Sequence, residues 1–222
     1  MRFALAATLV PLVLAAQTPA PASPAVQEWQ KQNSASLVTY QADHAKDHDK
    51  VDKALKDLDK REDSWLSLAR DFFGMTSANM MDPGYYDRQR RVRNEYRPRD
   101  DSSANELVTV RKAGDPAATV QALRSRTAIL TALMPENDSA EVEARKTIFY
   151  ANQTLDKFKA EDNPSLPPDQ KQFVKKAIDF YDKMIRATRL RADYHAGRSK
   201  AWRDEIDAIR KQMDAATAAI KP

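Results

Sequence analysis

The chain has 222 residues, of which 31% are charged, and it contains only four glycines and no cysteine. The lack of cysteine excludes disulfide bonds and lipid attachment at a lipobox, and the scarcity of glycine argues against a sheet with tight turns. The formal net charge of +4 is too small to indicate a polyanionic partner by itself.

The N-terminus has the pattern of a secretory signal peptide. Arg2 supplies a basic start, residues 3–16 form a short apolar run, and Ala20-Pro21-Ala22 offers a small-residue cleavage site. The apolar run is too short to span a membrane as a helix. We therefore expect a signal peptide over residues 1–22, a periplasmic or secreted mature protein, and no transmembrane span after cleavage. An uncleaved N-terminal anchor is the alternative.

Residues 23–222 are long enough for a single domain with its own core. Its last stretch, Pro168–Ile220, has an apolar or small residue at nearly every third or fourth position, which is the pattern of an amphipathic helix. This apolar seam contains Phe173, Ala177, Phe180, Met184, Ala187, Trp202, Ile206, Ile209, Met213, Ala216 and Ile220. Such a seam must pack against another helix.

A matching long helix is predicted near the N-terminus. Ser23 followed by Pro24 is typical of a helix N-cap with proline in the first turn, and the helix can continue to Phe73. Its seam contains His44, His48, Val51, Leu55, Leu58, Glu62, Trp65, Ala69 and Phe72. We therefore predict an all-α, elongated helical bundle in which the long N- and C-terminal helices run antiparallel like a coiled coil.

The middle of the chain begins with a predicted connector loop. Residues 74–102 contain Pro98, methionines, tyrosines and arginines without an apolar period. Residues 103–106 then match a capping box, which predicts a short helix that ends at Gly114.

Two further short helices are predicted after this turn. One should run over residues 116–133, and Pro135 should separate it from another that begins near Asp138. We expect the shorter central helices to pack beside the aromatic end of the long pair, leaving the opposite end as a hairpin of two helices. That aromatic end is defined by Trp65, Phe72, Phe173 and Phe180.

Three histidines form a candidate metal site. His44 and His48 are one helical turn apart and lie on one face of the first helix, a spacing that allows two imidazoles to bind one metal ion. Two registers of the antiparallel pair place His195 opposite residue 51 or residue 44. In both, the three histidines lie at about one level, and this ligand set suits Zn²⁺, Cu²⁺ or Ni²⁺.

The alternative is a polar layer that fixes the register of the helices. Side chains of the last helix at this level can pair with aspartates of the first helix. Two guanidinium groups also disfavour a divalent cation nearby, and a pH-sensitive histidine cluster is a third interpretation. The residues of the polar layer are Arg191, Tyr194 and Arg198 with Asp47, Asp49 and Asp52.

The connector also offers a candidate site for an anionic partner. Tyrosines lie among its arginines, as in many anion-binding surfaces. In a secreted protein, an anionic envelope component or an acidic protein suits this pattern better than nucleic acid does. A solvated linker neutralised by its own acidic residues is the alternative. The arginines are Arg88, Arg90, Arg91, Arg93, Arg97 and Arg99.

Sequence motifs of the common enzyme classes are missing from the chain, including G-x-S-x-G, H-E-x-x-H and a glycine-rich phosphate loop. We therefore expect no catalytic site and no cofactor other than Zn²⁺ or Cu²⁺ at the histidines. The first hypothesis is a non-enzymatic adaptor, chaperone-like or scaffolding factor of the cell envelope, with protein or anionic partners, no nucleic acid, and scope for homo-oligomerisation. The alternatives are a metal-binding bundle and an enzyme with an unrecognised carboxylate site.

Overall fold

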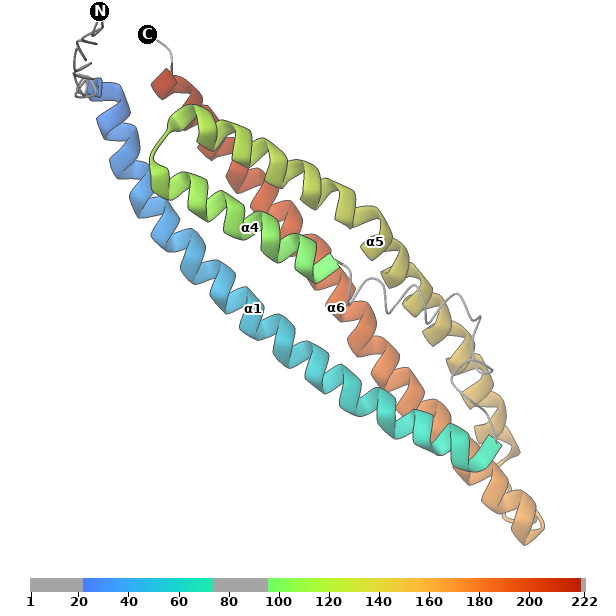
Figure 1. Cartoon of the computed structure of the whole chain (residues 1–222). Coiled ribbons are helices and arrows are strands. Elements are labelled where there is room, and N and C mark those ends of the chain that lie inside the picture. Colours follow the sequence, from blue (N-terminus) through green and yellow to red (C-terminus); the bar gives the residue numbers. More distant parts are fainter. Residues whose placement is uncertain (1–21, 74–95, 221–222) are drawn as a thin grey trace, which may run out of the picture.

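Four α-helices make up the regular structure of the residues that the structure describes. The structure is a computed structural model that describes residues 22–73 and 96–220. Its helices are α1 (Pro24–Phe73), α4 (Tyr96–Ala113), α5 (Pro116–Glu161) and α6 (Pro168–Ile220), and no strand occurs in the described ranges. None of these helices is long and apolar enough to cross a membrane. The predicted all-α, elongated bundle is confirmed (Figure 1).

The long helices α1 and α6 run antiparallel, with the end of α6 beside the start of α1, and α6 extends beyond α1 at the opposite end (Figure 1). The Tyr40 hydroxyl of α1 donates to Glu205 Oε1 of α6 at 3.0 Å, and Arg198 forms an ion pair with Asp47. These contacts fit the register that places residue 195 opposite residue 51, so the register that places it opposite residue 44 is wrong. Helix α4 runs antiparallel to α1, and α5 runs antiparallel to both α4 and α6.

Two helices begin at a capping side chain, and the cap at Ser23 is one that the sequence predicts. The Ser23 hydroxyl accepts from the Val26 N–H at 3.3 Å, and the Asp115 carboxylate accepts from the Ala117 N–H at 2.9 Å. Each capping residue satisfies an N–H group that has no partner inside its helix. Gly114, with φ of 72°, makes the left-handed turn that separates α4 from α5.

Helix α5 passes through Pro135 without ending, which corrects the prediction of two short helices in this region. The seam of α5 is buried on both sides of the proline, with Leu130 and Leu133 before it and Ala140 and Ala144 after it. Proline removes one backbone hydrogen bond, but packing of this long seam against α6 stabilises the helix where that bond is missing.

Helix α4 begins at Tyr96, seven residues before the predicted start at Ser103. Pro98 therefore lies in the first turn, where its missing N–H leaves no intrahelical bond unmade. The Ser103 hydroxyl donates to the carbonyl of Asp100 inside the helix at 2.9 Å, so it does not act as a cap. The expected connector loop is thus too long at its C-terminal end, and residues 74–95 lie outside the described residues.

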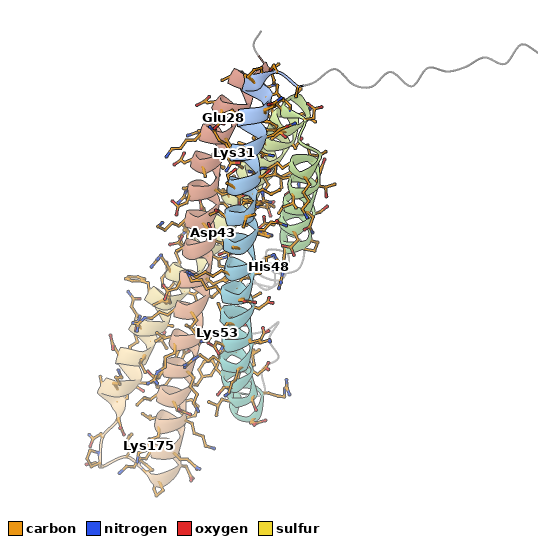
Figure 2. The ribbon with its side chains drawn as sticks, turned by 90° about the vertical axis from the view of Figure 1, so that its left-hand side faces the viewer. Glu28, Lys31, Asp43, His48, Lys53 and Lys175 are labelled. Atoms are coloured by element: carbon orange, nitrogen blue, oxygen red, sulfur yellow. The ribbon has the colours of Figure 1, made fainter. Side chains whose placement is uncertain are left out.

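The thicker part of the bundle lies at the end where α1 begins, which corrects the predicted position of the shorter helices. Helix α4 packs there, because Arg111 Nε donates to Asn33 Oδ1 at 2.9 Å and Gln30 Nε2 donates to the Gly114 carbonyl at 3.0 Å. The opposite end contains α1, α5 and α6 alone among the described helices (Figure 2). There the Trp65 and Phe180 ring centroids lie 5.9 Å apart.

Two main apolar cores fill the bundle, one in the four-helix part and one in the three-helix part. The first includes Leu123, Leu130 and Trp202, and the second includes Trp65 and Phe180. Charged and polar side chains lie between these cores, where α4 begins. The predicted polar layer therefore interrupts the apolar seams of the two long helices between the two cores.

Candidate functional site

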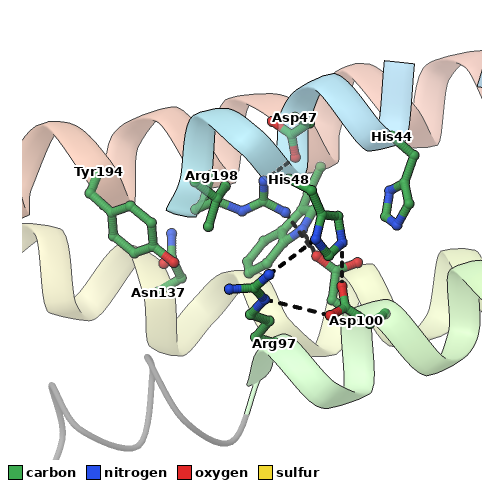
Figure 3. A pocket seen from close by; sticks show the side chains of 11 residues that line it. His44, Asp47, His48, Arg97, Asp100, Asn137, Tyr194 and Arg198 are labelled. Atoms are coloured by element: carbon green, nitrogen blue, oxygen red, sulfur yellow. Dashed lines mark hydrogen bonds and ion pairs between the residues drawn. The ribbon is translucent and has the colours of Figure 1, made fainter. Parts of the chain in front are cut away.

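The polar layer surrounds a small pocket of about 30 Å³ between the two cores. Helices α1, α4 and α6 supply most of its walls, and Asn137 of α5 completes it (Figure 3). A wider open groove of about 530 Å³ runs between α1 and α6 beside it. In the described residues, side chains of four helices therefore meet in one polar layer.

Asp100 is the buried centre of this layer. Its carboxylate accepts from Arg198 Nη2 at 2.8 Å and from the Trp202 indole N–H at 3.0 Å, and its Oδ1 lies 2.6 Å from Arg126 Nη1. Burial alone would raise the pKa of Asp100, but the two guanidinium groups and the indole hydrogen bond outweigh burial and lower it. Asp100 is therefore a charged anchor that fixes the start of α4.

Beside this anchor, His44 and His48 of α1 lie close to Asp101 of α4. One potential ligand atom from each of the three side chains lies within 4.8 Å of the others. His48 Nε2 is 2.7 Å from Asp101 Oδ1, and both of these side chains are 30% exposed. Figure 2 shows His48 on α1 near the level where α4 begins. Two imidazoles and a carboxylate are thus available to one ion.

The second ring nitrogen of His48 faces Arg97. Arg97 Nη2 lies 3.1 Å from His48 Nδ1, and a guanidinium can only donate hydrogen bonds. His48 Nδ1 must then be the acceptor, so the ring proton is on Nε2 and donates to Asp101. Arg97 also forms an ion pair with Asp52 and lies 3.5 Å, Nε to Oδ2, from Asp101.

His44 packs between two other rings of α1. Its ring stacks on Tyr40 with centroids 5.9 Å apart and meets His48 edge to face at 4.7 Å. Burial, and then the neighbouring His48, lower the pKa of His44 below its usual value. At neutral pH His44 is therefore the neutral imidazole, which is the form that binds metals.

The structure brings His44 and His48 together but directs His195 toward α5. His195 is only 1% exposed, and its Nδ1 lies 2.8 Å from Asn137 Oδ1. The cluster of metal-ligand type in the described residues contains Asp101 in the place predicted for His195. His195 instead belongs to a buried hydrogen-bond network between α5 and α6.

The predicted polar layer pairs some of its members as expected and others differently. Arg198 pairs with Asp47 of α1, as the sequence suggests, whereas Arg191 pairs with Glu62. Asp52 pairs with Arg97 of α4, a helix that was not expected at this level.

Two of the six arginines proposed to bind an anionic partner lie in the described residues. Arg97 is committed to Asp52, Asp101 and His48, and Arg99 is exposed on α4. Arg88, Arg90, Arg91 and Arg93 lie outside the described residues.

Asp101 was not predicted as a site residue, because residues 74–102 were expected to form a loop. Helix α4 begins before Arg97 and Asp101, which lie one turn apart, and both side chains contact α1. The useful signal was the spacing of four between these opposite charges, which favours a helix.

The class of protein that fold and site define is a four-helix antiparallel bundle with a polar layer between two apolar cores. No protein-family model, curated protein or solved structure matches the chain.

Proposed function

We propose that this protein is a non-enzymatic, metal-binding helical bundle that takes a transition-metal ion of the Zn²⁺ class at His44, His48 and Asp101. The observation that carries the proposal is the approach of three potential ligand atoms, from two helices, to within 4.8 Å of one another. The signal-peptide pattern at the N-terminus supports a location in the periplasm or outside the cell as part of the proposal.

The chemistry of the three side chains favours borderline metals. Two imidazole nitrogens and one carboxylate oxygen suit Zn²⁺, Cu²⁺ or Ni²⁺, whereas Mg²⁺ and Ca²⁺ prefer oxygen ligands. A tetrahedral zinc ion with ligands at about 2.0 Å separates them by roughly 3.3 Å. Small rotations of the half-exposed side chains would close the cluster around such an ion, and water would supply the fourth ligand.

The charge balance of the surrounding network also supports a cation. Four carboxylates line or adjoin the site, and two guanidinium groups pair with them. The further pair of Arg126 and Glu205 adds no net charge. Of the two arginines predicted to disfavour a divalent ion, Arg198 is offset by Asp47 and Asp100, and Arg191 pairs with Glu62 instead. The four carboxylates belong to Asp47, Asp52, Asp100 and Asp101.

The size of the pocket supports an ion rather than an organic substrate. A volume of about 30 Å³ holds an ion or a few water molecules.

Isothermal titration calorimetry of the full chain with Zn²⁺ tests the proposal. We expect about one Zn²⁺ per chain, and a loss of affinity of about tenfold or more when His48→Ala or Asp101→Asn removes a ligand. Asp49→Asn is the matched control, because it removes an exposed carboxylate of α1 beside His48. Equal affinity in wild type and His48→Ala, or no binding to wild type, would end the proposal.

Thermal unfolding gives a second readout. Because an ion that binds only the folded state stabilises it by mass action, Zn²⁺ should raise the unfolding midpoint of wild type, and a chelator should reverse the shift. No shift in wild type, or the same shift in His48→Ala, would contradict binding at the cluster.

A further inference from the structure

We propose that Arg97 is a built-in competitor of the metal ion, occupying His48 and Asp101 in the metal-free protein and leaving them when the ion binds. This inference rests on the proposed function and adds how the same site is regulated. Its basis is the position of the Arg97 guanidinium, 3.1 Å from His48 Nδ1, 3.5 Å from Asp101 Oδ2, and in an ion pair with Asp52.

The tautomer of His48 makes the competition unavoidable. Neutral imidazole carries one proton, and with Arg97 donating to Nδ1 that proton lies on Nε2, between His48 and Asp101. A metal ion on Nε2 needs the lone pair of that nitrogen, so the proton must move to Nδ1. The new Nδ1–H would then face a guanidinium N–H, two donors without an acceptor, and Arg97 must withdraw.

The proton balance of this exchange is neutral. One proton leaves Nε2 and one arrives at Nδ1, so His48 stays uncharged and the exchange needs no acid or base beyond water. If the ion bound Nδ1 instead, it would occupy the position of the guanidinium directly. Arg97 is displaced in either case.

Arg97 has a second partner that can hold it after displacement. Asp52 of α1 forms an ion pair with Nη1 of Arg97, and the side chains of Arg97 and Asp52 are 36% and 44% exposed. The guanidinium can therefore turn toward Asp52 and solvent without being buried unpaired. Asp101 loses one cationic partner and gains another.

In the metal-free protein, Arg97 thus supplies the positive charge that the ion would bring. It bridges α1 and α4 from the first turn of α4, one turn before Asp101. A weakly binding cation cannot replace this bridge, whereas an ion that coordinates two imidazoles can. Arg97 therefore lowers the affinity of every cation by the same factor, so that only ions with a strong preference for imidazole ligands, such as transition metals, still bind.

Zn²⁺ titrations of wild type, Arg97→Gln and Arg99→Gln test this role. Arg97→Gln should bind Zn²⁺ about tenfold more tightly or better, the range expected when one charge-assisted hydrogen bond no longer has to be broken. Arg99→Gln is the matched control, because it removes the same charge from an exposed position two residues away, and it should match wild type. A purely structural role for Arg97 would not strengthen binding.

Imidazole ¹⁵N NMR of wild type supplies a readout that needs no variant. In the metal-free protein, His48 should carry its proton on Nε2 and accept from Arg97 at Nδ1, and after Zn²⁺ is added Nδ1 should carry either the proton or the ion. If wild type binds Zn²⁺ but the ¹⁵N signal of His48 Nδ1 does not change, or if folded Arg97→Gln binds no more tightly, the competitor role is wrong while the metal site stands. If none of the three proteins binds Zn²⁺, both proposals are overturned.

Discussion

Arg126 of α5 and Glu205 of α6 form a two-pronged ion pair inside the four-helix part of the bundle. Arg126 Nε and Nη2 lie 2.9 Å from Glu205 Oε1 and Oε2, respectively, and Arg126 is 1% exposed. Its third nitrogen donates to the Asp100 carbonyl at 2.7 Å and to the Ser103 hydroxyl at 2.6 Å. One buried guanidinium therefore joins α4, α5 and α6.

Replacing Arg126 by methionine should strongly destabilise the fold. The change leaves Glu205 and Asp100 without their main cation in a buried place, and removing one partner of a buried ion pair lowers the free energy of unfolding by about 3–5 kcal/mol. Urea denaturation followed by circular dichroism measures this loss. Arg145→Met is the control, because Arg145 pairs with Glu141 on the surface and should contribute less than about 1 kcal/mol. Similar losses in both variants would contradict the role of the buried pair.

Trp65 should dominate the stability of the three-helix end. It is 1% exposed and packs edge to face on Phe180, so Trp65→Ala leaves a large cavity and should lower the free energy of unfolding by about 3–5 kcal/mol. Phe149→Ala removes an aromatic ring that is 58% exposed, and its effect should stay within about 0.5 kcal/mol. A small effect of Trp65→Ala in the same denaturation experiment would show that this end repacks.

The long helices were predictable because their local and long-range signals agree. In α1 and α6 a long apolar seam coincides with a capping residue or a turn at each predicted start, and Phe180 and Trp65 lie on those seams and meet in the core. The joining of the two predicted short helices into α5 could not be read locally. Pro135 is a strong local breaker, and only burial of the seam against α6 outweighs it.

The candidate site was half predictable for a related reason. His44 and His48 lie on one helix, so their spacing fixes their proximity. Asp101 depends on where α4 begins and on which side of α1 it packs, and neither is set by local sequence. The orientation of His195 toward Asn137 likewise depends on the rotation of α6 about its axis, which the packing of α5 fixes.

Pro135→Ala should stabilise the protein. Pro135 is exposed in the interior of α5, so alanine loses little packing, restores one backbone N–H donor and removes the clash of the ring with the preceding turn. We expect the free energy of unfolding to rise by about 1–3 kcal/mol. Pro116→Ala is the control, since proline is favourable at the first position of α5. A decrease in stability for Pro135→Ala would indicate that the proline ring contributes to the packing of α5.

Tyr181 should make the stability of wild type fall in alkaline solution. Its ring stacks on Phe158 at 5.8 Å and meets Phe180 at 5.0 Å, and burial raises its pKa above the usual value of about 10. Between the unfolded and folded pKa values, the folded chain holds a proton that the unfolded chain has released. The stabilisation is therefore complete below pH of about 10 and is lost as the pH rises through the folded pKa.

Tyr181→Phe removes this titration and leaves the ring contacts in place. The difference in free energy of unfolding between wild type and Tyr181→Phe should stay constant from neutral pH to about 10 and then shift in favour of the variant. Urea denaturation at a series of pH values measures it, and taking the difference cancels the titration of the other groups. Tyr150→Phe, at a position 64% exposed, controls for loss of a hydroxyl. Parallel stability curves for wild type and Tyr181→Phe up to the alkaline limit would show that the Tyr181 phenol ionises equally easily in the folded and unfolded chains.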